Sequence, residues 1–155
     1  MSFFQESLKE NNAIFAEIFM IRITRRETFN AAHRLYNPKW TEEKNYEIFG
    51  PCSRLHGHNW TLFVTVAGEV KEETGFVMDL KKLKDLVRAV IIDKVDHRYL
   101  NEDVDFLAGK LPSTEIFAQE IWKQLEPVIL EKYGVKLFEV NLHETENHYA
   151  QYFGD

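Results

Sequence analysis

Two kinds of hydrophobic periodicity, in a fixed order along the chain, limit the folds open to this sequence. Apolar side chains alternate with polar ones in four stretches, and apolar residues recur at helical spacing in two stretches between the second and the third of these. The predicted strands cover residues 20–29, 60–70, 138–142 and 149–153, and the predicted helices cover 79–93 and the region from 112 to 133. This order, ββααββ, favours an α+β fold: a two-layer sandwich with a four-stranded antiparallel sheet and two helices on one face.

Capping residues mark the starts of the predicted helices. Asp79 can cap the first helix through its side-chain oxygen, and Pro112 followed by Ser113 is typical of the start of the second. Pro127 could break the second helix, because proline lacks the N–H that a helix interior requires. We predict a long loop for residues 36–51.

The chain length of 155 residues suits one domain with a core of its own. A hydrophobic fraction of 45% and an aromatic fraction of 14% argue against disorder. We expect a single domain over residues 20–155. Residues 1–19 have a weak helical pattern and are interpreted as an N-terminal extension without an assigned function, with an ordinary N-terminal helix as the alternative.

The charge balance disfavours nucleic acid as a partner. The chain has 25 acidic and 19 basic side chains, and the net charge of -6 opposes the attraction to phosphate that nucleic-acid binders use. A small anionic substrate remains compatible with this balance, because a local cluster of basic side chains and a metal ion can oppose the overall field.

We expect the chain to be cytoplasmic and not bound to a membrane. Cys52 is the single cysteine, so the sequence has no intramolecular disulfide framework. No stretch approaches the roughly 18 consecutive apolar residues that a membrane-spanning helix needs. The first residues also lack the basic start, apolar centre and cleavage site of a secretory signal.

The run His56-Gly57-His58, at the start of the second predicted strand, is the main chemical signal. Side chains two residues apart on a strand project from the same face at roughly 6 to 7 Å, so two imidazoles can bind one metal ion. His33 supplies a third imidazole if the first two strands pair. Three histidines with an open fourth position are typical of catalytic zinc, although other divalent ions would also bind. The alternative is a solvated His-x-His pair unrelated to His33.

Five short segments carry a resemblance to a known family. They are Phe29–Leu35, Cys52–Trp60, Asp96–Asn101, Pro112–Glu115 and His143–Thr145. The first two are similar to the metal-site signatures of the 6-pyruvoyl and 6-carboxy-tetrahydropterin synthase family, and the other three follow in the family's order. The resemblance implies the tunnelling fold (T-fold), which assembles through its strands into a barrel-shaped homo-oligomer, a hexamer, with active sites between subunits.

The resemblance implies that Cys52 is a catalytic acid and base, with Asp96 and His97 as its relay partners, beside a Zn²⁺ bound by the three histidines. A nearby metal ion or imidazolium favours the thiolate form of a cysteine. A carboxylate bonded to one imidazole nitrogen raises the basicity of the other, as a proton relay requires. Without the resemblance, a lone cysteine is more often a small buried hydrophobic residue.

The resemblance places substrate-binding residues at two further segments. Glu144 would anchor the pterin, and Ser113, Thr114 and Glu115 would lie on the pterin side of the second helix start. Glu144 continues the alternating apolar face of the third strand, and a carboxylate there can accept two adjacent N–H groups of a pterin ring. Without the resemblance, a glutamate at a strand end is equally compatible with a solvated side chain.

Two branches of the family act on 7,8-dihydroneopterin triphosphate, a small-molecule partner. We expect the branch that forms 6-carboxy-tetrahydropterin, acetaldehyde and triphosphate for queuosine synthesis, because only three residues separate Cys52 from His56. Residues 36–51 and 144–147 look closer to the 6-pyruvoyl-tetrahydropterin branch, which is the alternative. A dihydroneopterin-aldolase-like side activity and a non-catalytic pterin- or metal-binding protein also remain open.

Overall fold

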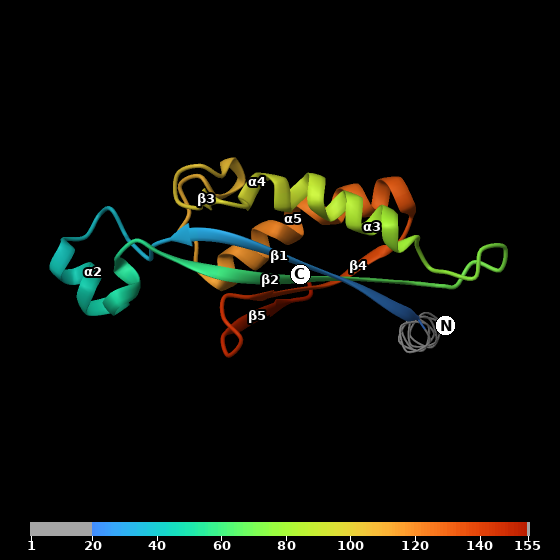
Figure 1. Ribbon diagram of the computed structural model, residues 1–155, viewed down its shortest axis with the longest axis horizontal. Helices are drawn as coiled ribbons and strands as arrows, with labels where there is room; N and C mark the ends of the chain where they lie inside the picture. The colour runs from blue at the N-terminus through green and yellow to red at the C-terminus, as the bar shows by residue number, and fades with distance from the viewer. Residues whose placement is uncertain (1–19, 155) are drawn as a thin grey trace, which may run out of the picture.

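The computed structural model describes residues 20–154, and its central element is one open, five-stranded sheet (Figure 1). The strands are β1 (Ile21–His33), β2 (His56–Gly68), β3 (Arg98–Tyr99), β4 (Lys136–His143) and β5 (Tyr149–Tyr152), in the sheet order β3-β1-β2-β4-β5. Four of them are the predicted strands, paired antiparallel. The predicted α+β fold is confirmed. Among the described strands, β3 is the one that the sequence analysis missed, and it pairs with β1 in parallel over two residues.

β1 and β2 form a long antiparallel pair that decides where the histidines lie. Each strand has 13 residues, and the pairing runs from Ile21 opposite Gly68 to His33 opposite His56. β1 therefore extends four residues beyond its predicted end at Phe29. The extension has a physical basis, because Phe29 and the alternate residues after it continue the buried face of the strand.

The predicted loop at 36–51 contains a helix, so this part of the prediction is wrong. α2 (Glu42–Phe49) begins at Thr41, whose side chain accepts a hydrogen bond from the backbone of Lys44, and a 3-10 turn, η1 (Gly50–Ser53), follows it. Figure 1 shows α2 beyond the end of the sheet, on a projecting arm between β1 and β2. Asn45 is fully buried in this arm and bonds to the backbone of the segment before the helix.

The two long helical regions begin where the sequence predicted. Asp79 caps the first, which consists of α3 (Leu80–Val87), a π-helical turn η2 (Arg88–Ile92) and α4 (Asp93–Val95). Ser113 caps α5 (Thr114–Tyr133), and the short 3-10 turn η3 (Asp105–Leu107) precedes it. Pro127 does not break α5, since it is exposed and water can satisfy the carbonyl that it leaves without a partner.

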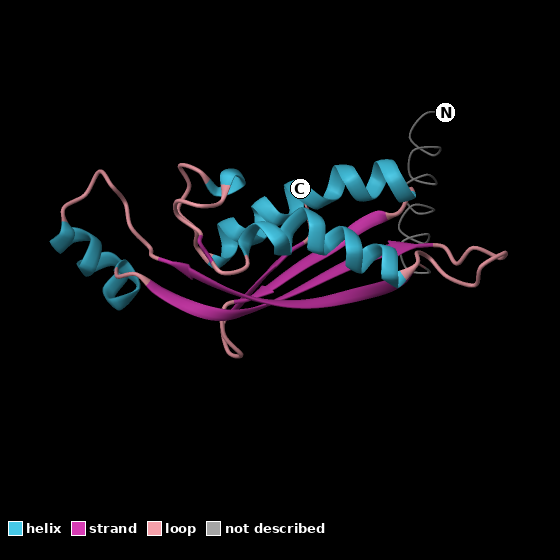
Figure 2. Ribbon diagram, turned by 45° about the horizontal axis from the view of Figure 1, so that its top comes forward, coloured by secondary structure: helices cyan, strands magenta, loops and turns pink. Residues whose placement is uncertain are grey.

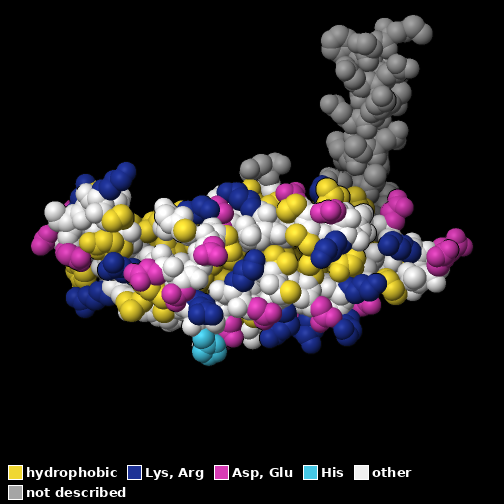
Figure 3. All heavy atoms as spheres, turned by 90° about the horizontal axis from the view of Figure 1, so that it is seen from above, with side chains coloured by type: hydrophobic (Ala, Val, Ile, Leu, Met, Phe, Trp, Pro, Cys, Tyr) yellow, Lys and Arg dark blue, Asp and Glu magenta, His cyan; other side chains and the backbone are white. Residues whose placement is uncertain are grey.

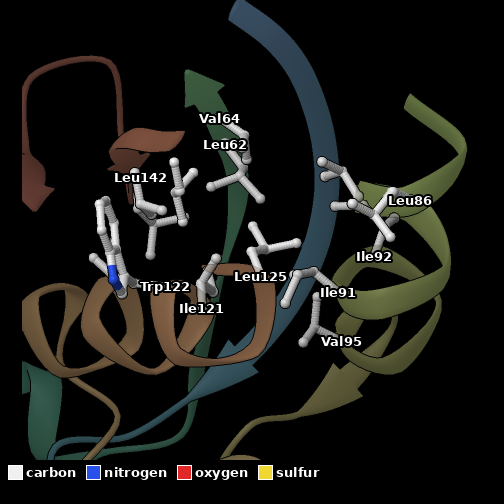
Figure 4. Close-up of a cluster of buried hydrophobic side chains, with 14 of the residues drawn as sticks. Leu62, Val64, Leu86, Ile91, Ile92, Val95, Ile121, Trp122, Leu125 and Leu142 are labelled. Atoms are coloured by element: carbon white, nitrogen blue, oxygen red, sulfur yellow. The ribbon is translucent and has the colours of Figure 1, made fainter. Parts of the chain in front are cut away.

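The core lies between the sheet and these helices, which cover one of its faces (Figure 2). Figure 4 shows side chains of β2, β4, α5 and the α3–α4 region pointing toward one another in this layer. Leu62, Ile91, Ile121, Leu125 and Leu142 are fully buried there. Burial of each such side chain contributes about 1.5–3 kcal/mol, so this layer is the main source of stability and holds β1 and β2 rigidly.

The outer surface of the helical layer carries acidic and basic side chains interspersed with one another (Figure 3). No helix within residues 20–154 is long and apolar enough to cross a membrane. The predicted extension at residues 1–19 lies outside the described residues, and the division of the chain at residue 20 stays a prediction.

Candidate active site

Three histidines meet at one end of the sheet. His33 ends β1, and His56 and His58 begin β2 on the same face. Their ring centroids lie 4.7 to 5.1 Å apart, and each ring offers a nitrogen within 4.8 Å of those of the other two. His33 is completely buried, whereas the other two are partly accessible. The structure therefore brings together the three histidines that the sequence analysis selected, and the cluster is accessible from the side of His56 and His58.

The hydrogen bonds of the histidines prepare their Nε2 atoms for a metal ion. Nδ1 of His33 lies 2.8 Å from the carbonyl oxygen of Pro112, and Nδ1 of His56 lies 2.7 Å from that of Arg54. A carbonyl oxygen only accepts, so both Nδ1 atoms carry a proton, and in the neutral form of each ring the lone pair that binds a metal ion is on Nε2. Nε2 of His33 and of His58 are buried without a hydrogen-bond partner. A divalent cation would satisfy these two nitrogens, and the donor set fits zinc.

An aromatic layer supports the histidines from below. The Trp60 ring lies 5.2 Å from that of His33 and 5.6 Å from that of His58, and it stacks on Phe29. Its Nε1 donates to the carbonyl oxygen of Ala31, which fixes the ring. Burial lowers the pKa of His58, with Glu144 opposing this effect. His58 is thus held neutral, which is the form that binds a metal ion.

Glu144 follows β4 and points at the histidines. Its Oε1 lies 3.2 Å from Nε2 of His33 and 3.6 Å from Nε2 of His58, within ion-pair range but outside hydrogen-bond geometry. The adjacent His33 imidazole is the main cause that lowers the pKa of Glu144; burial opposes it, and His58 adds to it. The carboxylate is therefore ionised and close to the histidines.

The loop after β4 holds Glu144 in place. The backbone N–H of Glu144 donates to the carbonyl oxygen of His148, and the Thr145 hydroxyl accepts from the backbone N–H groups of Asn147 and His148. A cavity of about 930 Å³ opens beside this loop, lined among others by His58, Glu144 and Thr145. Its volume is in the range of small-molecule sites.

Asp96 lines the same cavity, and His97 lines a neighbouring one that His58 also borders. Oδ1 of Asp96 accepts from the backbone N–H of Asn30 at 2.9 Å, and the backbone N–H of His97 donates to the carbonyl oxygen of Asn30 at 2.6 Å. The Asn30 N–H is the main cause that lowers the pKa of Asp96. His97 has a φ of 58°, and its Nδ1 lies 3.0 Å from Oδ1 of Asp96. This pair has the geometry of a carboxylate-oriented imidazole.

Cys52 does not join that pair within one chain. It lies exposed in η1 on the projecting arm, where its carbonyl oxygen accepts from the backbone N–H of Leu35. Asp96 is instead bonded to Asn30, which lies five residues before Leu35. Five residues of largely extended chain separate the two attachment points by roughly 15 Å, at about 3.3 Å per residue. The predicted relay is therefore not assembled in a single subunit.

Of the three residues predicted to bind substrate at the start of α5, Ser113 has a structural role in this chain. Ser113 uses its hydroxyl to cap the helix at the N–H of Ile116, 3.4 Å away. Thr114 and Glu115 form the first turn, and none of the three lines the 930 Å³ cavity. Pro112 contributes instead through its carbonyl oxygen, which orients His33. Sequence reasoning missed this contact because a backbone carbonyl leaves no signal in residue type.

Comparisons with known proteins identify relatives along most of the chain. A sequence model described as "6-pyruvoyl tetrahydropterin synthase" matches residues 22–155. The chain is 41% identical over 133 residues to the 6-pyruvoyl tetrahydrobiopterin synthase of Dictyostelium discoideum, a match that covers 86% of this chain and 96% of the relative. The solved structure of Caenorhabditis elegans 6-pyruvoyl tetrahydropterin synthase superimposes with a TM-score of 0.80 at 35% identity, covering 88% of this chain and 96% of that one.

The prediction of the 6-carboxy-tetrahydropterin branch is wrong on these findings. The 6-carboxy-5,6,7,8-tetrahydropterin synthase of Bacillus subtilis is 37% identical over only 83 residues, 52% of this chain and 54% of the relative. Similarity along nearly the whole chain is to enzymes with the pyruvoyl name. The short spacing between Cys52 and His56 therefore does not separate the two branches, since it is a local feature of the arm.

Proposed function

Because the chain belongs to the 6-pyruvoyl tetrahydropterin synthase family, we propose that it is a lyase that converts 7,8-dihydroneopterin triphosphate to 6-pyruvoyl-tetrahydropterin with loss of triphosphate. The observation that carries the proposal is the convergence of three imidazoles, two with unsatisfied buried nitrogens, beside an ionised carboxylate. This arrangement combines a place for a metal ion with an anchor for a heterocycle. We further propose that the reaction takes place in the cytoplasm.

His33, His56 and His58 would hold a zinc ion through their Nε2 atoms. Zinc would supply Lewis acidity that makes a substrate hydroxyl, and the C–H beside the resulting carbonyl, more acidic. The protein's part is to fix the imidazoles, and the Pro112 and Arg54 carbonyls do this for two of them.

Glu144 would anchor the pterin. Its carboxylate is ionised, its backbone is held by His148, and it can accept the two adjacent N–H groups on the pyrimidine edge of a pterin. Its present approach to the histidine nitrogens occupies space that a bound cation would take, so we expect the carboxylate to turn toward the 930 Å³ cavity when the metal is bound.

Cys52 would move protons on the substrate side chain, with Asp96 and His97 as its relay. His97 is held through Nδ1 by Asp96, which leaves Nε2 to exchange a proton with the thiol. Since one chain keeps Cys52 apart from this pair, we propose that two chains of a homo-oligomer complete each site, consistent with a hexamer in which Thr114 and Glu115 also contact substrate.

The test is product identification by mass spectrometry after anaerobic incubation of the zinc-loaded protein with 7,8-dihydroneopterin triphosphate. The proposal predicts 6-pyruvoyl-tetrahydropterin and triphosphate, without acetaldehyde, and loss of the product in Cys52→Ala. Acetaldehyde as a stoichiometric product would contradict the assigned branch. Absence of turnover with full zinc occupancy would show instead a non-catalytic binding protein.

A further inference from the structure

A second cavity, of about 540 Å³, lies between the arm that carries α2 and the loop after β3. It shares no lining residue with the cavity at Glu144. Figures 1 and 2 both show these two segments at the same end of the molecule. Its basic and aromatic lining residues are Arg34, Tyr36, Lys39, Trp40, Phe49, Tyr99 and Lys110. The combination of cations and aromatic rings indicates a site for an anion.

Neighbouring residues fix both the backbone and the side chain of Arg34 in this cavity. The Asn101 side chain bonds to both backbone groups of Arg34, accepting from its N–H and donating to its carbonyl oxygen, each at 3.0 Å. The guanidinium carbon lies 4.1 Å from the centre of the Tyr36 ring. Stacking of this kind restricts the side chain while leaving the guanidinium N–H groups available in the plane.

The positive charge of the cavity is not fully neutralised by the protein. Within residues 20–154, no carboxylate lies in ion-pair range of Arg34 or Lys39, although Glu102 also lines the cavity. Lys110 differs, because its ammonium group pairs with Glu120 at 2.8 Å. Arg34 and Lys39 are therefore two cations that line one cavity without a carboxylate partner there, which gives this cavity a local positive charge.

The cavity is connected to the histidines through the backbone of β1, although none of the three lines it. Arg34 follows His33 directly, so their α-carbons are about 3.8 Å apart. Glu144 lies in the other cavity, which also includes His58. A substrate whose heterocycle is bound at Glu144 and whose side chain lies at the histidines would extend its remaining group toward Arg34.

We propose that Arg34 and Lys39 bind the triphosphate of the substrate. This inference rests on the proposed function, because that reaction requires a substrate with a highly charged triphosphate. Arg34 can bind two phosphate oxygens through its planar fork, and Lys39 supplies a point charge at the rim. Charged hydrogen bonds of this kind contribute about 1.5–3 kcal/mol each, which corresponds to roughly 10- to 100-fold in affinity.

The direct test is the binding of inorganic tripolyphosphate to metal-free protein, measured by calorimetry and by the fluorescence of Trp40, which lies in the cavity. Metal-free protein is used because tripolyphosphate chelates zinc. We expect Arg34→Gln and Lys39→Gln each to weaken binding by roughly 10-fold or more, and Arg34→Lys to restore part of it. Lys82→Gln, which removes an exposed charge on α3, is the matched control and should leave binding unchanged.

A kinetic comparison separates this site from the rest of the reaction. In Arg34→Gln the KM for 7,8-dihydroneopterin triphosphate should rise by roughly 10-fold or more, while the dissociation constant of unphosphorylated 7,8-dihydroneopterin stays the same. Equal weakening of both ligands, or tripolyphosphate binding as tight in both variants as in Lys82→Gln, would overturn the assignment. If no pyruvoyl product forms but tripolyphosphate binds through Arg34 and Lys39, the proposed reaction fails and the anion site stands.

Discussion

At the scale of single residues, the three histidines differ in how they are held. His33 and His56 are each oriented by a backbone carbonyl, whereas His58 is positioned by packing on Trp60. A hydrogen bond to Nδ1 fixes both the tautomer and the ring plane, so two of the three ligands are preorganised. Glu144 completes the set with a charge opposite to that of a metal ion.

Glu144→Gln tests the pterin anchor separately from the metal. An amide replaces one acceptor by a donor, so the bidentate bond to the pterin is lost while the shape of the side chain is kept. We expect kcat/KM to fall by roughly 10- to 100-fold and zinc content to stay at one equivalent per chain. Glu131→Gln, an exposed change near the end of α5 and away from this cavity, should leave both unchanged. Unchanged kcat/KM in Glu144→Gln would remove the anchor role.

At the scale of elements, the arm between β1 and β2 places Cys52. Asn45 Nδ2 donates to the carbonyl oxygens of Asn37 and Thr41, and its Oδ1 accepts from the backbone N–H of Asn37. These bonds tie the start of α2 to the segment that leaves β1. Trp40 stacks on Phe49 at the other end of the helix, directly before the turn that contains Cys52.

Asn45→Ala should therefore loosen the whole arm. It leaves the partly buried backbone N–H of Asn37 without a partner and removes a second donor from the carbonyl oxygens of Asn37 and Thr41, and an unsatisfied group of this kind costs about 1–3 kcal/mol. We expect the free energy of unfolding, from urea titration, to fall by about 2 kcal/mol. Glu47→Ala, an exposed change on the same helix, should stay within about 0.5 kcal/mol of the parent protein. Equal values for the two variants would show that the arm does not depend on Asn45.

Glu120 on α5 binds Lys110 in the loop after η3, and this ion pair makes the free energy of unfolding depend on pH. Burial would raise the pKa of Glu120, but hydrogen bonds from Lys110 and Lys123 outweigh it and lower the pKa. Its stabilising effect is therefore present above the unfolded glutamate pKa of roughly 4.3 and lost as the pH falls through the lower folded value. Between pH 7 and about pH 3, urea unfolding of Glu120→Gln should change less than that of the parent or of the exposed control Glu131→Gln.

The sequence predicted those elements whose information is local. Alternation placed the histidines on one face, and the capping residues Asp79 and Ser113 placed both long helical regions. It missed α2, since that helix depends on the buried side chain of Asn45 and has only a weak apolar face. It also missed β3, because two residues paired with a distant strand leave no periodic pattern.

At the scale of the whole molecule, two features of the chain are compatible with association of identical copies: its open sheet edges and its separated relay residues. The sheet is open, with the short strands β3 and β5 at its edges. Cys52 lies in η1, which follows α2 on the projecting arm, whereas Asp96 and His97 lie between α4 and β3. Figure 1 shows α2 beyond the end of the sheet and away from α4. The resemblance implied active sites between subunits, but it did not say that Cys52 and the Asp96–His97 pair would lie apart within one chain.

Mixing two inactive variants tests whether chains share a site. Cys52→Ala and Asp96→Asn should each be inactive alone. After unfolding and refolding together in equal amounts, an oligomer with shared sites should regain roughly a quarter of parental activity, since some sites receive both intact residues. Activity should stay absent if each site uses one chain only. Either variant refolded by itself is the control for recovery of structure.

The central claim is that His33, His56 and His58 hold one zinc ion, and the most direct test is the zinc content per chain of purified protein by plasma mass spectrometry. We predict close to one equivalent in the parent and in His97→Ala, which removes a histidine outside the cluster, and a loss of nearly all zinc in His56→Ala. Equal zinc content in His56→Ala and His97→Ala would contradict the account.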